Sequence, residues 1–228
     1  MISLIGIHGL LGTGKDTFAG FLTDHIGYSF AEPLRRGLLN LNPWLMLTDV
    51  DIPKVFASDN KPEVSIGPWV PLSEIVYSLG WDEAKKNPMV RSYMQKYGTE
   101  AGRDIHGQDC WIKIAEKFVD EHERVVIRDV RFANEADAIY AWEFMKHKLK
   151  NKTVLVKMLG ESRREHVQEA TQHASEQGLP DFLFDYLVWN DGTLEDLAWS
   201  ANYIANHAPP KRQLKIICHS RTITEVTE

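Results

Sequence analysis

Short apolar runs and amphipathic segments alternate along most of the chain. The runs are rich in β-branched residues, as is typical of buried strands, and they predict strands at residues 2–8, 28–31, 125–129, 153–158 and 186–189. Apolar residues at helical spacing predict helices at residues 15–25, 90–103, 134–148 and 194–206, with a further helix beginning at Asp109. This alternation predicts an α/β fold, in which helices cover both faces of a mostly parallel sheet.

Three stretches depart from this alternation. Residues 40–90 are interrupted by prolines and glycines, which predicts an insertion with short helices rather than a separate domain. Residues 161–178 are polar and charged, and predict a helix that is too polar to belong to the core. After Pro209 and Pro210, residues 214–218 are apolar enough to form an added edge strand.

Composition narrows the functional classes. A length of 228 residues suits one α/β domain with insertions or two very small domains. The formal net charge of −6 argues against DNA binding through a general basic surface. Cys110 and Cys218 lie far apart and form no C-x-x-C pair, which suits a reducing cytosol. The chain lacks a basic leader and an apolar run near the ~18 residues of a membrane span. We therefore expect a cytoplasmic protein that binds neither membranes nor nucleic acids.

The most specific motif lies near the N-terminus. Gly9, Gly12, Thr13, Gly14 and Lys15 fit the phosphate-binding pattern G-x-x-x-x-G-K, between a predicted strand and a predicted helix. Glycines allow the backbone N–H groups of such a loop to approach phosphates, and the lysine adds a positive charge. A chance match in a strand-to-helix turn is the alternative. The strand and the helix on either side favour the nucleotide site.

The loop departs from the usual pattern at its end. The residue after the lysine is normally Ser or Thr, whose hydroxyl holds magnesium, but here it is Asp16, followed by Thr17. One helical step turns a side chain by about 100°, so Thr17 cannot simply take over the hydroxyl's place. A carboxylate in the first helical turn can support magnesium or only cap the helix. Both interpretations of Asp16 stay open at this point.

Asp129 ends a β-rich run, as does the acid that holds magnesium in many nucleotide-binding proteins. The alternatives are a helix cap or a salt bridge with Arg128 or Arg131. ATPase motors usually place a catalytic glutamate directly after this acid. Because Val130 follows here, the sequence disfavours an ATPase that activates water.

Several arginines stand where they could neutralise phosphates, which is most of what phosphoryl transfer requires of a protein. These are Arg35, Arg36, Arg103, Arg128, Arg131, Arg163 and Arg164. Asn190 follows the last strand of the alternating pattern, where it could border a base or form a plain turn. Trp69, Trp81, Tyr97 and Trp111 could stack on a base or pack in the core. His173 and Glu176 share a predicted helical face, for which we prefer a structural or lid role.

Six sequence blocks occur in an order that resembles the deoxynucleoside monophosphate kinases of bacteriophages. They cover Gly9–Thr17, Trp81–Lys86, Gln95–Arg103, Val126–Ala136, His173–Glu176 and Asn190–Thr193, and so span about residues 1–200. The resemblance implies a three-layer P-loop kinase fold and transfer of the γ-phosphate of ATP to a deoxynucleoside monophosphate. It also implies Mg²⁺, a homodimer and, for a phage protein, the cytoplasm of the host. Lys-Asp-Thr in place of Lys-Ser or Lys-Thr is a trait of that family.

The resemblance also implies roles for individual residues. Lys15 would bind ATP phosphates within the loop of Gly9, Gly12, Thr13 and Gly14, with Thr17 on the α-phosphate side. Asp16 and Asp129 would surround magnesium, partly through waters, and Asn190 completes the candidate ATP site at the adenine. Arg35, Tyr97, Arg103 and Arg131 would bind the acceptor, and Arg163 and Arg164 would close on the transferring phosphate. Residues 1–208 would form the kinase domain, with an acceptor-binding region at 33–104 and a lid at 160–182. The tail, 209–228, lies outside the resemblance.

Three other functional classes compete with a deoxynucleoside monophosphate kinase. A P-loop kinase for dephospho-coenzyme A or phosphomevalonate would share the loop and similar arginines. A nucleotide-operated switch that reads guanine would carry Asn-Lys-x-Asp after a strand. Here Asn151 and Lys152 are followed by Thr153 and Val154, and they precede a predicted strand. The acidic balance disfavours a DNA-binding protein.

Overall fold

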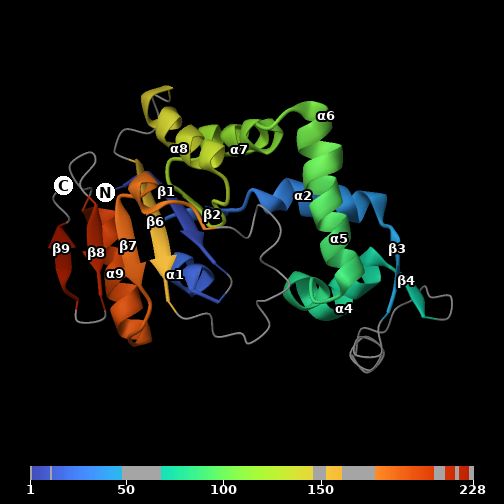
Figure 1. The fold of residues 1–228 in the computed structure, drawn as a ribbon, viewed down its shortest axis with the longest axis horizontal. Coiled ribbons are helices and arrows are strands. Elements are labelled where there is room, and N and C mark those ends of the chain that lie inside the picture. Colours follow the sequence, from blue (N-terminus) through green and yellow to red (C-terminus); the bar gives the residue numbers. More distant parts are fainter. Residues whose placement is uncertain are drawn as a thin grey trace. The chain divides into compact units, whose positions relative to one another are not determined.

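A computed structural model describes residues 2–10, 12–47, 68–145, 153–160, 178–207, 214–218 and 221–225. The chain divides into two compact units. The sheet unit comprises Met1–Phe30 and Ile112–Glu228, and the helical unit comprises Ala31–Trp111. Figure 1 gives the helices and strands of both units.

The sheet unit is built on a single sheet. Within the described residues it has seven strands in the order β2-β5-β1-β6-β7-β8-β9, all parallel to their neighbours except β9. Their bounds are β1 Leu4–Gly9, β2 Ile26–Tyr28, β5 Val125–Ile127, β6 Thr153–Leu159, β7 Tyr186–Trp189, β8 Lys215–Ile217 and β9 Ile223–Glu225. Because β1 lies between β5 and β6, the strand order reverses around it, which is where parallel sheets bind ligands.

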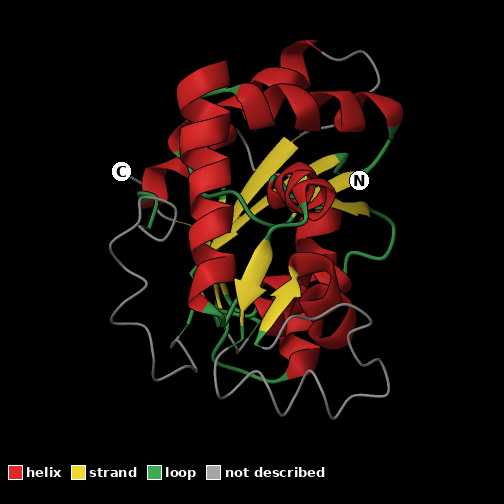
Figure 2. Cartoon of the chain, turned by 90° about the vertical axis from the view of Figure 1, so that its right-hand side faces the viewer, coloured by secondary structure: helices red, strands yellow, loops and turns green. Residues whose placement is uncertain are grey.

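Helices cover both faces of this sheet, as Figures 1 and 2 show. On one face, Ile5 and Ile7 of β1 pack in a core with Phe18 of α1 (Lys15–Gly20) and with α9 (Leu194–Asn206). On the other, Leu4 packs in a core with α7 (Cys110–Glu121) and α8 (Ala133–Met145). A 3₁₀ turn, Asp181–Leu183, precedes β7. The predicted α/β architecture with a mostly parallel sheet is confirmed.

Some boundaries differ from the predicted ones. Helix α1 ends at Gly20 rather than near His25, because Phe21 and Leu22 make tight bonds to the carbonyls three residues earlier. Phe21 stays 36% exposed, whereas Phe18 and Leu22 are buried. The strand predicted at residues 214–218 is not at the edge, because β9 pairs antiparallel with its outer side.

The helical unit consists mainly of short helices. They are α2 Ala31–Leu41, α4 Leu72–Ala84, α5 Pro88–Lys96, a π-helix at Tyr97–Arg103 and α6 Asp104–His106. A two-stranded ribbon pairs β3 (Trp44–Met46) with β4 (Trp69–Pro71). The helix predicted at residues 90–103 instead begins at Pro88, where the Asn87 side chain accepts a hydrogen bond from the N–H of Met89. From Lys96 the chain passes directly into the π-helix.

Close packing on glycines sets the position of the π-helix. Tyr97 lies with its hydroxyl against Gly37 of α2. A Cβ atom added at Gly98 would lie 2.7 Å from Leu34 of α2. One added at Gly102 would lie 2.6 Å from the ring of Trp111. The Trp111 ring is itself fixed, because its Nε1–H donates to the carbonyl oxygen of Gly98 at 2.9 Å. These contacts hold both ends of the segment that carries Tyr97 and Arg103.

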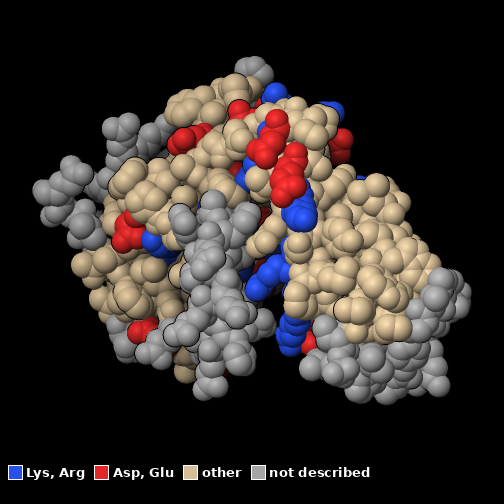
Figure 3. Space-filling view, turned by 45° about the vertical axis from the view of Figure 1, so that its right-hand side comes forward, with Lys and Arg blue, Asp and Glu red and all other residues tan. Residues whose placement is uncertain are grey.

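Figure 3 shows acidic and basic side chains close to one another on the same face. Among the described residues, none of the helices combines the length and the apolar character that crossing a bilayer requires.

Candidate functional site

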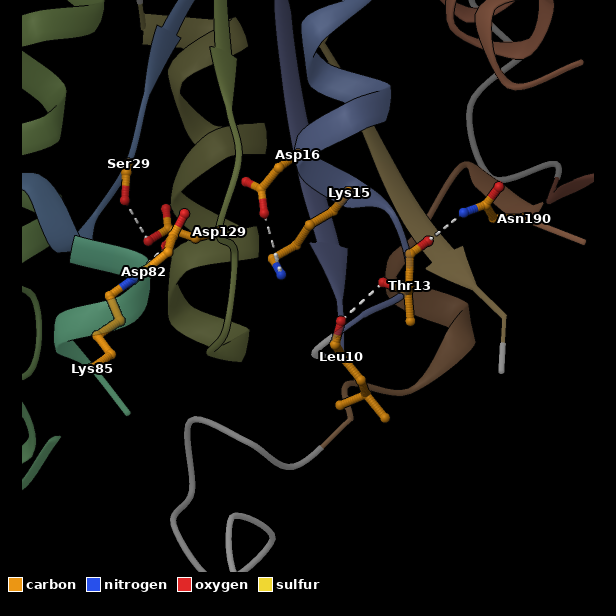
Figure 4. A network of polar contacts seen from close by, with 9 residues as sticks. All are labelled: Leu10, Thr13, Lys15, Asp16, Ser29, Asp82, Lys85, Asp129 and Asn190. Atoms are coloured by element: carbon orange, nitrogen blue, oxygen red, sulfur yellow. Dashed lines mark hydrogen bonds and ion pairs between the residues drawn. The ribbon is translucent and has the colours of Figure 1, made fainter. Parts of the chain in front are cut away.

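Two side chains hold the loop between β1 and α1 in shape, one from the loop itself and one from the residue after β7. Thr13 is buried, and its hydroxyl donates to the Leu10 carbonyl oxygen at 2.9 Å. The side-chain amide of Asn190, which follows β7, donates to the Thr13 carbonyl oxygen at 3.0 Å (Figure 4). Gly14 has φ +86°, and any side chain there would collide with the Asn190 amide. The loop is thus a defined turn tied to a neighbouring part of the sheet.

Lys15 and Asp16 open α1 beside this turn. The Lys15 side chain is 14% exposed, and its ammonium lies 3.9 Å from a carboxylate oxygen of Asp16. The Asp16 side chain is 74% exposed, so the pair is loose and well hydrated. The N-cap of α1 is Gly14, without a side-chain capping bond, so Asp16 is not the cap residue. Thr17 is exposed on the same helix.

Asp129 is positioned by the end of β2. It is buried, and the Ser29 hydroxyl donates to its Oδ2 at 2.6 Å. The backbone N–H of Phe30 donates to its Oδ1 at 2.7 Å. Figure 4 shows Ser29 pointing at this carboxylate. The two donors therefore orient the carboxylate of Asp129.

The residues after Asp129 are fixed as well. The Val130 N–H donates to the Ile7 carbonyl oxygen at 3.0 Å. The buried Glu135 carboxylate, in α8, accepts from the backbone N–H groups of Arg131 at 2.8 Å and Phe132 at 3.2 Å. The backbone that carries Arg131 therefore has a defined course from β5 to α8.

His8 lies in β1 directly before the glycine loop and is buried. Its Nδ1 lies 2.8 Å from the Val130 carbonyl oxygen, and its Nε2 accepts a bond from the Leu179 N–H at 3.3 Å. Burial lowers the pKa of His8, and the positive charges of Lys157, Lys15 and Arg131 lower it further, against the opposing effect of the bond to Val130. The ring is therefore neutral near pH 7.

In the helical unit, the predicted acceptor residues lie on α2 and the π-helix. The guanidinium carbon of Arg35 lies 5.7 Å from the centroid of the Trp81 ring, within cation–π range. The Arg35 Nε is buried and has no hydrogen-bond partner among the described residues. Tyr97 and Arg103 begin and end the π-helix. The Trp111 ring packs 6.1 Å from that of Tyr97, so these rings support the unit's own structure.

The structure thus groups part of the predicted site. In the sheet unit it brings together Gly9, Gly12, Thr13, Gly14, Lys15, Asp16 and Thr17 with Asn190, and places Asp129 and Arg131 after the strand next to β1. Arg35, Tyr97 and Arg103 belong to the helical unit. Arg163, Arg164, His173 and Glu176 lie outside the described residues.

The sequence prediction missed three supporting residues: His8, Ser29 and Glu135. Each had a signal of its own. His8 is a polar residue inside an apolar run, next to the glycine loop. Ser29 follows β2 much as Asp129 follows β5. Glu135 stands three residues after Phe132, the spacing at which a glutamate reaches back to a helix N-terminus.

The donor set fits magnesium rather than a metal bound by protein ligands alone. Within the described residues, no group of three or more His, Cys, Asp or Glu side chains is arranged to hold a metal ion. Magnesium commonly uses one or two carboxylates and completes its shell with waters and substrate phosphates. Among the candidate site residues, Asp16 and Asp129 suit this pattern.

Comparison with known proteins gives one family. The family model described as deoxynucleotide monophosphate kinase matches residues 47–200, a stretch that begins after the glycine loop. A protein assigned as a deoxynucleotide monophosphate kinase in Acanthamoeba polyphaga mimivirus is 31% identical over 144 residues, covering 60% of this chain and 67% of the relative. The deoxynucleoside-5'-monophosphate kinase of Escherichia phage T5 is 25% identical over 224 residues, covering 79% of this chain and 86% of the relative.

Proposed function

Because the chain belongs to the deoxynucleotide monophosphate kinase family, we propose that it transfers the γ-phosphate of ATP to a deoxynucleoside monophosphate. The products are ADP and a deoxynucleoside diphosphate for DNA precursor synthesis. The observation that carries this proposal is the closed turn at Gly9–Lys15, tied to β7 through Asn190, beside the fixed carboxylate of Asp129. A glycine turn with a lysine at its end suits the triphosphate of ATP.

Lys15 contributes a positive charge to the β- and γ-phosphates. Its nearest carboxylate, Asp16, is exposed and loosely paired, so an incoming phosphate can displace this contact at little cost. The Thr13 side chain and the Asn190 amide keep the loop backbone in place. Thr17 serves the α-phosphate side, and Asn190 also borders the adenine.

Asp16 and Asp129 hold magnesium, in part through waters. The ion neutralises charge on the β- and γ-phosphate oxygens. Asp129 is the better oriented of the two, because Ser29 and Phe30 fix its carboxylate. Asp16 reaches the ion from an exposed position on α1.

Four residues receive the acceptor: Arg35, Tyr97, Arg103 and Arg131. Arg35 has a buried Nε without a partner among the described residues, and a phosphate oxygen would satisfy such a donor. Guanidinium groups suit this task because their planar donors match a phosphate. Arg131 also contributes to catalysis, since its backbone leads directly from Asp129.

We assign Arg163 and Arg164 to the transferring phosphate, with residues 160–182 as a lid and residues 33–104 as the acceptor-binding region. Closure of a lid excludes water, which favours transfer over hydrolysis. We also propose a homodimer that acts in the cytoplasm of a phage-infected host.

A coupled assay of ADP release tests the proposal. Each deoxynucleoside monophosphate is supplied with ATP and Mg²⁺, and the diphosphate product is identified by chromatography. ADP release should be slow without an acceptor and should rise steeply with dTMP or dGMP. Dephospho-coenzyme A and phosphomevalonate test the second class of kinase in the same assay. Equal rates with and without any acceptor would contradict the proposal.

A further inference from the structure

His8 connects two segments that lie far apart in the sequence. Its Nδ1 bonds to the carbonyl oxygen of Val130, directly after Asp129. Its Nε2 bonds to the N–H of Leu179, which leads to β7. Its ring also stacks on that of Phe184, with centroids 5.4 Å apart. One buried side chain therefore contacts both the segment after β5 and the segment before β7.

Only one protonation state of His8 satisfies both bonds. An N–H group can only donate, so the Leu179 N–H requires a bare Nε2. A carbonyl oxygen can only accept, so the Val130 oxygen requires a proton on Nδ1. The neutral Nδ1–H tautomer meets both demands. Protonation at Nε2 would set two N–H groups against each other and break the link to Leu179.

The peptide at Leu179 is held from a second direction. Lys157 pairs with His8 across β6 and β1, and its ammonium donates to the Leu179 carbonyl oxygen at 2.5 Å. The same ammonium donates to a carboxylate oxygen of Asp181 at 2.6 Å. Both polar groups of the Leu179 residue are thus bound by side chains of neighbouring strands. We call this residue, held by His8 and Lys157, the Leu179 anchor.

We propose that His8 is a positioning residue that couples the segment carrying Asp129 and Arg131 to the Leu179 anchor. Its consequence for phosphoryl transfer rests on the function proposed above. Through Val130, His8 fixes the backbone between the carboxylate that serves magnesium and the arginine that serves phosphate. Through Leu179, it ties this backbone to the start of the segment leading to β7 and Asn190. His8 is buried and bonded to protein groups, so it acts through these segments.

The coupling has a defined pH dependence. The charged groups around the His8 ring are Lys157 on β6, Lys15 on α1 and Arg131 after β5, with Asp181 bound to Lys157. Burial and these cations lower the pKa of His8 below its ordinary value of 6.5. The link is therefore present at neutral pH and is lost as the pH falls through the lowered pKa.

Three variants separate the two bonds. His8→Asn places an amide near the Nδ1 position and retains a donor for Val130. His8→Gln places one near the Nε2 position and retains an acceptor for Leu179. His8→Phe keeps the ring on Phe184 and removes both bonds. His25→Phe is the matched control, because His25 is also a buried histidine of the sheet unit but binds the Ile2 carbonyl oxygen instead.

Hydrogen exchange tests the coupling without any need for activity. In His8→Phe, amide exchange should speed up roughly tenfold in residues 130–132 and also at Leu179, since one ordinary hydrogen bond corresponds to about this factor. His8→Asn should affect mainly Leu179, and His8→Gln mainly residues 130–132. His25→Phe should affect neither. Unchanged exchange in either segment of His8→Phe would overturn the coupling, as would imidazole ¹⁵N shifts of the Nε2–H tautomer.

Steady-state kinetics test the consequence of this coupling for phosphoryl transfer. In His8→Phe, kcat should fall roughly tenfold at pH 7.5 with a smaller change in KM for ATP, and the two amide variants should recover part of it. Wild-type kcat should fall as the pH drops through the lowered pKa of His8. This part of the fall should disappear in His8→Phe and persist in His25→Phe, because the titration of the substrates is the same for both variants. Full kcat in His8→Phe would overturn the positioning role. A wild-type protein without transfer activity would count against the proposed kinase function alone, because the exchange result stands independently of it.

Discussion

The two units hold their candidate site residues in different ways. In the sheet unit, hydrogen bonds to fixed backbone or side-chain groups set the position: Asp129 is held by Ser29 and Phe30, and the loop is held by Asn190. In the helical unit, the residues are held mainly by packing: Arg35 lies over Trp81, and Tyr97 lies against Gly37.

This difference predicts different sensitivities. A hydrogen-bonded site is sensitive to the loss of a polar atom, because the remaining partner is left unsatisfied. A close-packed site is sensitive to the addition of volume, because neighbouring atoms must move. Loss of a charge or a polar group should therefore impair the site residues of the sheet unit most. An added methyl group should impair those of the helical unit most.

The largest effect should come from the sheet unit. Lys15→Ala should lower kcat about a hundredfold to a thousandfold, the usual consequence of removing one charge contact from a transition state. Because the ammonium pairs only loosely, at 3.9 Å, with the exposed carboxylate of Asp16, the melting temperature should stay nearly constant. Steady-state kinetics and thermal unfolding measure the two quantities. Arg124→Ala is the control, since Arg124 pairs with Asp24 before β5 begins. Near-full activity in Lys15→Ala would show that the glycine loop is not the phosphate site.

The next effect should come from the helical unit. Gly102→Ala places a methyl group against the Trp111 ring, which cannot easily move because it is bound to Gly98. The free energy of unfolding should fall by about 1–3 kcal/mol, the usual cost of overpacking. The KM for the acceptor should rise as well, because Arg103 is the next residue. Urea unfolding and acceptor titration provide the measurements.

Gly20→Ala provides the comparison for this variant. A Cβ atom there meets no other atom within 4 Å. Gly20 lies in α1, where alanine is favoured over glycine by about 1 kcal/mol, so this variant should be neutral or slightly more stable. Equal losses in both variants would show that packing on Trp111 is not the cause.

The same contrast explains which features could be predicted from the sequence. The strand, loop and helix around Gly9–Lys15 are adjacent in the chain, so their local pattern sufficed. Asp129 was selected as a candidate because it ends an apolar run. Ser29 was missed because its role depends on a partner 100 residues away. The π-helix at Tyr97–Arg103 was not predicted, and it packs against Leu34 and Trp111, which lie outside that segment. A local pattern can mark such a residue as a candidate, but it does not identify a partner so far away in the chain.

A smaller effect concerns the buried histidines of the sheet unit. Burial lowers the pKa of both His8 and His25 in the folded protein. The unfolded chain therefore binds more protons between these lowered values and about 6.5. The free energy of unfolding should be highest above pH 6.5 and should decline as the pH falls, by at most about 1.4 kcal/mol per pH unit for each histidine. Urea titrations from pH 7.5 to 5.5 measure this slope.

Replacing one histidine identifies its share of this slope. His25→Phe should flatten the decline and leave the contribution of His8 in place. His25 suits this purpose because it lies away from the loop, with its Nε2 on the Ile2 carbonyl oxygen. A slope that does not change in this variant would assign the pH dependence to other groups.

The smallest effect on stability should come from a change at Asp16, which is exposed, whereas Asp129 is buried. Asp16→Asn keeps the size of the side chain and removes only its charge. Asp16 makes no capping bond, and its pair with Lys15 is loose, so unfolding should change by less than about 0.5 kcal/mol. If Asp16 supports magnesium through a water, half-maximal activity should require roughly fivefold more Mg²⁺, the equivalent of one exposed charge contact of up to ~1 kcal/mol.

Ser29→Ala is the counterpart on the buried carboxylate. It removes a donor to Asp129 and should lower both stability and magnesium affinity. A magnesium requirement that is unchanged in Asp16→Asn but raised in Ser29→Ala would assign the ion to Asp129 alone.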